Sequence, residues 1–299
     1  MNKSQTYLFR KFSIGISRFL KKSDLITLGI VVTSFFLLYS NIGLDLVNQW
    51  REDENYSHGF LIPFVSGFLV WRKWPEIISL EKKPWGFGLF FFILGLSLFI
   101  FGHIGGEFFL QRFSMILVIL GLILWNLGWL YAKLLAFPLF FLIFMIPWPY
   151  ILYDSIAFPL QILASKVATV SLSLLHVPVF REGNIIHLTS TTLQVEDACS
   201  GIRSLVSLLA LTTIYSYVAQ KVFLSRLILV ASAIPIAVLL NSLRVSITGV
   251  MAAFYGDRVA QGFFHGFSGW VVFLFAFILI FFVNRFISHV FKLVEKYNR

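Results

Sequence analysis

Residues 226–250 read RLILVASAIPIAVLLNSLRVSITGV, and this stretch decides the class of the fold. It is long and apolar enough to cross a bilayer, which takes about 20 residues of α-helix. The rest of the chain has the same character, since 58% of its 299 residues are hydrophobic and only 13% are charged. The mean hydropathy is +0.85. We therefore predict an all-α polytopic membrane protein.

The apolar runs predict about eight transmembrane helices. Seven of them are clear, and the eighth, 57–71, is short but has charged residues on both sides. The predicted spans are 25–44, 57–71, 85–103, 113–130, 134–151, 202–219, 226–250 and 267–284. The chain then divides into a basic N-terminal segment (1–24), a transmembrane domain (25–287) and a basic tail (288–299).

A further apolar segment, 155–177, is interrupted by Gln161, Lys166 and several hydroxyl side chains. We expect it to form an interfacial or re-entrant helix, which leaves both ends of the chain on one side of the membrane. That side then holds most of the 24 Lys and Arg residues, as cytoplasmic loops do. The same distribution argues against nucleic acid as the partner that the net charge of +10 could suggest.

A small extracytoplasmic β-hairpin is predicted before the sixth span. Residues Ile185–Leu188 and Thr192–Val195 alternate between apolar and polar side chains, and a turn rich in Ser and Thr separates them. The hairpin would lead the chain directly to Cys199, the only cysteine of the sequence.

Three reactive side chains are expected at a similar depth on the outer side. Cys199 precedes the span 202–219, and His265 precedes the last span. Arg244 lies 18 residues after Arg226, which is about 27 Å along a helix at 1.5 Å per residue. Consecutive antiparallel helices could therefore bring the three side chains together.

The surroundings of Cys199 bear on its ionisation. A helix N-terminus and Arg203, four residues later, both favour the thiolate over the thiol. Glu196 and Asp197 oppose this effect unless they face water or cap the helix. A thiolate could attack a carbonyl carbon, a histidine could move protons, and Arg244 could hold the oxyanion of the intermediate.

Each of the three residues also has a structural interpretation. A single cysteine in a membrane protein is commonly a small buried apolar residue. An arginine near a helix end can extend its charge to the interface, and a histidine there can serve as a hydrogen-bonding residue. The joint occurrence favours function, because ionisable residues within a membrane are costly.

Four motifs resemble one family of membrane enzymes. ACSGIRSL (198–205), NSLRV (241–245) and HGFSGW (265–270), in this order and spacing, are similar to the exosortase/archaeosortase family, and YSHGFLIP (56–63) is similar to its N-terminal motif. The resemblance implies Cys199 as nucleophile, Arg244 as catalytic arginine and His265 as the third member, with histidine typical of the bacterial branch. The residues expected to bind substrate or support the site are Arg203, Asn241, Tyr56 and His58.

The resemblance also implies a substrate and a location. The family acts on secreted proteins whose C-terminal sorting signal has a short motif such as Pro-Glu-Pro, a transmembrane helix and a basic tail. We expect cleavage through a thioester on the outer face of a bacterial inner membrane, with hydrolysis or transfer to an acceptor. Some members carry a domain linked to exopolysaccharide production; here a separate protein is the expected partner, besides membrane lipids.

A different class of function stays open at this point. A transporter or an assembly scaffold for polysaccharide export could use Arg244 and His58 to line a polar pathway. The sequence has no HExxH zinc motif, phosphate-binding loop or dinucleotide fingerprint, so we expect neither a metal nor a cofactor. The GFSG at 266–269 is similar to a serine-protease motif, but no second suitable histidine accompanies it.

The charge distribution generates a topology prediction. Reporter fusions at the C-terminus should be active only as cytoplasmic reporters, and a fusion after residue 180 should report from the outside. A cytoplasmic signal after residue 180 would show that the order of crossings before it is wrong.

Overall fold

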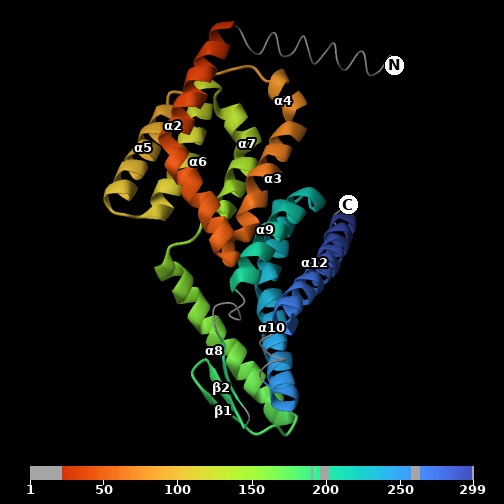
Figure 1. Ribbon diagram of the computed structural model, residues 1–299. Helices are drawn as coiled ribbons and strands as arrows, with labels where there is room; N and C mark the ends of the chain where they lie inside the picture. The colour runs from red at the N-terminus through yellow and green to blue at the C-terminus, as the bar shows by residue number, and fades with distance from the viewer. Residues whose placement is uncertain (1–21, 190, 196–201, 257–262, 298–299) are drawn as a thin grey trace, which may run out of the picture. The chain divides into compact units, whose positions relative to one another are not determined.

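The computed structural model describes residues 22–189, 191–195, 202–256 and 263–297. The chain forms two compact units, and the boundary falls between Pro149 and Tyr150. Helices dominate both units, and the single small sheet of the described residues belongs to the second (Figure 1).

The first unit consists of helices and their short connections. Its elements are α2 (Lys22–Glu52), the 3₁₀ helix η1 (Glu54–Phe60), α3 (Leu61–Arg72), α4 (Trp74–Ser79), α5 (Gly88–Ile104), α6 (Phe108–Asn126), α7 (Trp129–Phe141) and the 3₁₀ helix η2 (Leu142–Met145).

Proline breaks the hydrogen bonding of α7, and neighbouring side chains repair it. Pro138 has no N–H to offer the carbonyl of Leu134, four residues earlier. Lys73 Nζ donates to that carbonyl instead, at 2.8 Å. Where α7 changes to η2, the N–H of Leu142 bonds the carbonyl of Leu139, so it does not bond the carbonyl of Pro138. Ser66 Oγ donates to the Pro138 carbonyl instead, at 2.9 Å. These bonds fix α3 alongside α7.

Glycines allow α5 and α6 to pack closely as a hairpin. A Cβ atom on Gly95 would lie 2.7 Å from Val118 Cγ2 and 2.9 Å from the Val118 nitrogen. Gly88 and Gly102, seven residues away on either side, are also buried. Small residues at such a seam let helix backbones approach, as they do between transmembrane helices.

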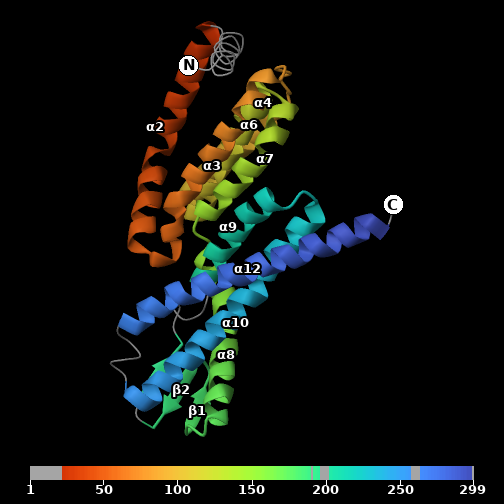
Figure 2. The same ribbon diagram turned by 90° about the vertical axis from the view of Figure 1, so that its right-hand side faces the viewer.

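The second unit carries the sheet and the long helices. Its elements are α8 (Tyr150–Leu174), β1 (Val179–Glu182), β2 (Ile185–Leu188), β3 (Thr192–Gln194), α9 (Ile202–Ala219), α10 (Phe223–Tyr255) and α12 (Phe263–Tyr297). One apolar core joins α8, the sheet and α10. A second joins α9, α10 and α12, and α12 crosses α10 obliquely (Figure 2).

The predicted count of about eight crossings is not confirmed. Within the described residues, five helices are long and apolar enough to cross a membrane: Ile26–Glu52, Phe108–Asn126, Tyr150–Leu174, Phe223–Phe254 and Gly269–Leu293. Three shorter apolar helices, Gly88–Ile104, Trp129–Met145 and Ser204–Ala219, accompany them. The predicted span 57–71 is divided between η1 and the 12-residue helix α3.

The interfacial or re-entrant helix expected at 155–177 is helical as far as Leu174, and its position relative to the membrane stays a prediction. The segment belongs to α8, one continuous helix of 25 residues that is among the five candidate spans. Two polar residues of this helix, Gln161 and Ser165, are buried against other parts of the protein. Their side chains bond the sheet rather than face lipid.

The predicted hairpin is confirmed as β2 and β3, which pair antiparallel with Ile186 opposite Leu193. The sequence analysis missed β1, which pairs with β2 through a two-residue turn at Gly183 and Asn184. Gly183 has a φ of +60°, a conformation that glycine adopts readily and that two-residue hairpin turns require.

The α5–α6 seam gives a test of the first unit. Gly95→Ala should destabilise the detergent-solubilised protein by about 1–3 kcal/mol, because the added methyl group overpacks the contact with Val118. Gly67→Ala in α3 is the control, since a Cβ there meets nothing within 4 Å. Thermal melting measures both variants, and equal melting temperatures would contradict the close seam.

Candidate active site

Arg244 is buried well inside α10. Its exposed fraction is 8%, and the helix continues beyond it to Tyr255 before Gly256 ends it with a φ of +79°. α10 therefore continues beyond the predicted span 226–250, and the expected position of Arg244 near the outer boundary of the membrane stays a prediction.

Arg244 lies on the face of α10 that packs against α9 and α12. Ala237 and Leu240 precede it by seven and four residues on the same face. Both belong to the core that includes Leu205 of α9 and Ala276 of α12. Arg244 therefore continues this packed face towards the ends where α9 and α12 begin.

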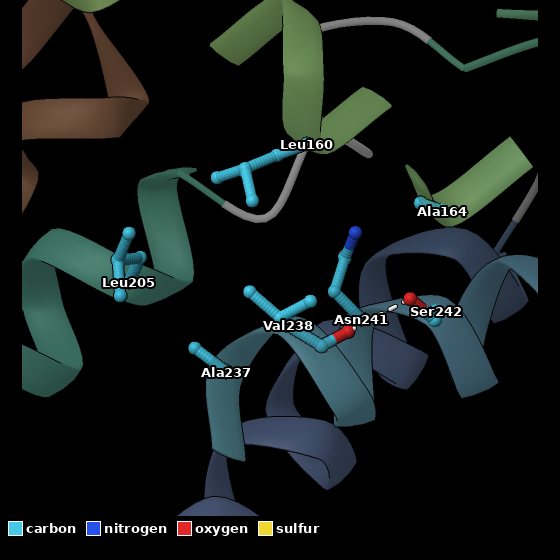
Figure 3. A pocket seen from close by; sticks show the side chains of 7 residues that line it. All are labelled: Leu160, Ala164, Leu205, Ala237, Val238, Asn241 and Ser242. Atoms are coloured by element: carbon cyan, nitrogen blue, oxygen red, sulfur yellow. Dashed lines mark hydrogen bonds between the residues drawn. The ribbon is translucent and has the colours of Figure 1, made fainter. Parts of the chain in front are cut away.

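Asn241 lies one turn before Arg244 and is 2% exposed. It lines a cavity of about 10 Å³ between α8, α9 and α10, about the space that one water molecule needs. In Figure 3 its side chain points from α10 towards α8, between Leu160 and Ala164. Leu205, on the cavity wall, is only six residues after Cys199.

Three of the predicted residues are located less fully. Cys199 lies outside the described residues, between β3 and α9. Arg203 is in the first turn of α9 and His265 in the first turn of α12, and the structure describes their backbone alone. The structure thus places Asn241 beside Leu205 of α9, with Arg244 one turn further along α10; the contact between Cys199, Arg244 and His265 stays a prediction.

A polar cluster joins the end of α9 and the start of α10 to Asn284 and Ser288 within α12. Gln220 Nε2 donates to Asn284 Oδ1 at 2.6 Å and to Ser288 Oγ at 2.8 Å. Asn284 Nδ2 donates to Tyr215 OH at 2.9 Å, and Arg226 Nε donates to Gln220 O at 2.8 Å. α9, α10 and α12 therefore share a common base.

Distances along the helices can be counted from that base. Arg244 is 18 residues from Arg226 and His265 is 19 from Asn284, or about 27 and 28 Å at 1.5 Å per residue. α9 has 18 residues and ends beside Gln220, so it begins at about the same height. These are distances along each helix, and because α12 crosses α10 obliquely (Figure 2), the common depth of Cys199, Arg244 and His265 stays a prediction.

The sheet fixes the chain just before Cys199. Asn184 Nδ2 donates to Gln161 Oε1 of α8 at 3.2 Å and to the carbonyl of Val195 at 3.1 Å. Asn184 O accepts from the Val195 N–H at 3.0 Å. Ser165 Oγ of α8 also donates to Gly183 O at 3.0 Å.

These bonds make α8 the support of the segment that carries Cys199. Val195 is 2% exposed and lies four residues before the cysteine. The sequence analysis missed Asn184 in this role, although the adjacent glycine and asparagine are a recognised signal for a two-residue turn. Only the fold shows that the turn meets Gln161.

Tyr56 and His58 belong to the first unit. His58 Nε2 lies 3.2 Å from Phe144 O, and Tyr56 OH accepts from the Trp148 N–H at 3.2 Å. Nearby, Trp50 Nε1 donates to Met145 O at 2.9 Å. The two predicted supporting residues thus hold η1 against η2 and the residues that follow it, and a role towards substrate stays a prediction.

Comparison with known proteins gives one match. The family model described as transmembrane exosortase matches residues 50–282. Neither a curated protein nor a solved structure matches the chain. Among the described residues, no group of three or more His, Cys, Asp and Glu side chains could hold a metal ion.

The support beneath Val195 can be tested directly. Asn184→Asp replaces the donor with a carboxylate that faces two acceptors, Gln161 Oε1 and Val195 O, and should destabilise this region by about 1–3 kcal/mol. Hydrogen exchange at the Val195 amide should accelerate. Ser155→Ala, at an exposed hydroxyl of α8, is the control. Unchanged exchange in Asn184→Asp would show that the bonds contribute nothing.

Proposed function

Because this chain belongs to the transmembrane exosortase family, we propose that it is a cysteine peptidase embedded in the bacterial inner membrane. Its substrates are secreted proteins that end in a short motif, a transmembrane helix and a basic tail. It cuts them on the outer face, with both of its own ends in the cytoplasm. Water or an amine acceptor then releases the shortened protein.

The burial of Arg244 is the observation that supports this proposal most. An arginine that only extended its charge to the interface would expose its guanidinium, whereas Arg244 is 8% exposed. A buried charge is costly and is retained where it has a task. Its place on the face towards the starts of α9 and α12 suits a task beside Cys199 and His265.

The proposed first step is attack by the Cys199 thiolate on the scissile carbonyl carbon. The start of α9 and Arg203 favour the thiolate. A carbon–sulfur bond forms, and the carbonyl oxygen becomes an oxyanion. Arg244 holds that oxyanion with a charge already in place, which is the most effective way to stabilise such an intermediate. Asn241, one turn away, has a supporting role in the proposed site, since its side chain points towards α8 (Figure 3).

Collapse of the intermediate completes the cleavage. The carbon–nitrogen bond breaks, and His265 gives a proton to the leaving amine, which stays on the transmembrane part of the substrate. The thioester on Cys199 is then attacked by water or by an acceptor amine, with His265 removing its proton. We propose a separate protein as the link to exopolysaccharide.

Substitutions at Cys199 and Arg244 test this assignment. Cys199→Ala should abolish processing of a co-expressed reporter that ends in such a sorting signal. Arg244→Ala should slow processing by about 10²–10³-fold, the usual loss for an oxyanion donor. Arg244→Lys should not restore it, because a lysine lacks the planar pair of donors. Gel shift of the reporter measures all three.

A control variant shows whether the loss of processing is specific to the proposed catalytic residues. Arg285→Lys changes an exposed arginine of α12 and should process the reporter as the wild type does. All variants are compared at equal amounts in the membrane. Full processing by Arg244→Ala would show that Arg244 is not part of the active site. Full processing by Cys199→Ala would show that no thioester forms on Cys199.

A further inference from the structure

The outer edge of β3 is the feature of the second unit that the proposed chemistry leaves unused. The sheet has the order β1-β2-β3, so β3 is a terminal strand. In the part of the chain that the structure describes, no further strand pairs with it. Thr192 and Gln194 are both exposed.

The register identifies which backbone groups point outward. Val195 N–H bonds Asn184 O, and Leu188 N–H bonds Thr191 O. Hydrogen-bonded pairs alternate along an antiparallel ladder, so Leu193 also bonds inward, to Ile186 opposite it. The N–H and C=O groups of Thr192 and Gln194 therefore face away from the sheet.

The two edges of the sheet differ in chemistry. β1 reads VFRE and carries Arg181 and Glu182, and charges of this kind discourage pairing with another chain. β3 reads TLQ and has neither a charge nor a proline. A row of outward N–H and C=O groups without such protection is a template for another strand.

The open edge leads directly to the proposed nucleophile. Gln194 is five residues before Cys199, a span of at most about 17 Å of extended chain. A polypeptide bound along β3 would present its carbonyl groups in a regular row within that reach of Cys199. Added strands gain affinity from main-chain bonds and specificity from alternate side chains.

We propose that the substrate polypeptide binds in extended form as a fourth strand on the outer edge of β3, which presents its scissile bond to Cys199. This inference rests on the proposed function and adds a binding surface to it. The main-chain groups of Thr192 and Gln194 hold the substrate. The bonds from Asn184 and Gln161 hold that edge in place.

A pair of proline variants tests the edge without changing the catalytic residues. Gln194→Pro removes an N–H that points outward, a change that an edge strand can accept. Arg181→Pro removes the equivalent outward N–H from β1, on the opposite edge. Gln194→Pro should process the reporter at least about tenfold more slowly, as the loss of a main-chain bond of about 1.4 kcal/mol predicts. Arg181→Pro should process it normally.

Alkylation of Cys199 by an impermeant maleimide checks both variants independently of substrate. Unchanged alkylation in Gln194→Pro, together with slow processing, supports substrate binding at the outer edge of β3. Processing within about twofold of the wild type overturns it. The proposed function still stands in that case, because the wild type processes the reporter.

Crosslinking gives a second measurement that needs no turnover. The photoreactive amino acid benzoylphenylalanine replaces Thr192 in the Cys199→Ala variant and, as a control, Phe180 in β1. The reporter should crosslink at position 192 and not at 180. Crosslinking at neither position, at both equally, or at 192 only to a second copy of this chain would overturn the proposal.

Discussion

A backbone carbonyl or N–H in the bilayer core has no water to bond, so any break in a helix must be repaired by the protein itself. The first unit follows this constraint at Pro138, where Lys73 and Ser66 satisfy the carbonyls that the proline and the 3₁₀ turn release. Because each repair joins α3 to α7, a local defect becomes a tertiary contact.

The second unit meets the same constraint with its sheet and its helix ends. α8 gives side-chain bonds to the β1–β2 turn through Gln161 and Ser165. At the other end, Gln220 satisfies groups of α12. The outer edge of β3 is the contrast, since its register leaves main-chain groups directed outward. The outer edge of β1 carries Arg181 and Glu182, whereas β3 has no charge, and this difference is why the proposed substrate strand is assigned to β3.

Much of the fold could be predicted because hydrophobic runs determine membrane helices. The predicted span 202–219 coincides with α9, and the β2–β3 hairpin was located from alternation alone. The errors have physical causes. The strand β1 was not predicted, because VFRE at 179–182 is short and its pairing with β2 depends on the turn at Gly183 and Asn184. The end of α10 was placed too early, since a helix continues past its most apolar stretch until a residue such as Gly256 ends it.

The sequence could predict which residue types belong to the candidate site, but only part of how they are arranged in space. Arg244 is conspicuous in the sequence because a charge in an apolar run is costly. Its burial and its face could not be obtained from periodicity, since they depend on how α9 and α12 pack on α10. Asn184 shows the reverse case: its turn is readable from the sequence, but its partners, Gln161 and Val195, become neighbours only in the fold.

The segment that carries Cys199 is held at both of its ends. Before it, Val195 is fixed to Asn184 and through it to α8. After it, Leu205 packs into the core shared with α10 and α12. Arg244 follows Ala237 and Leu240 of that same core along α10, so the proposed oxyanion donor is supported by the core that holds the chain after the proposed nucleophile. Catalysis depends on holding reacting groups in place before the charge develops, and a shared core is one way to provide this.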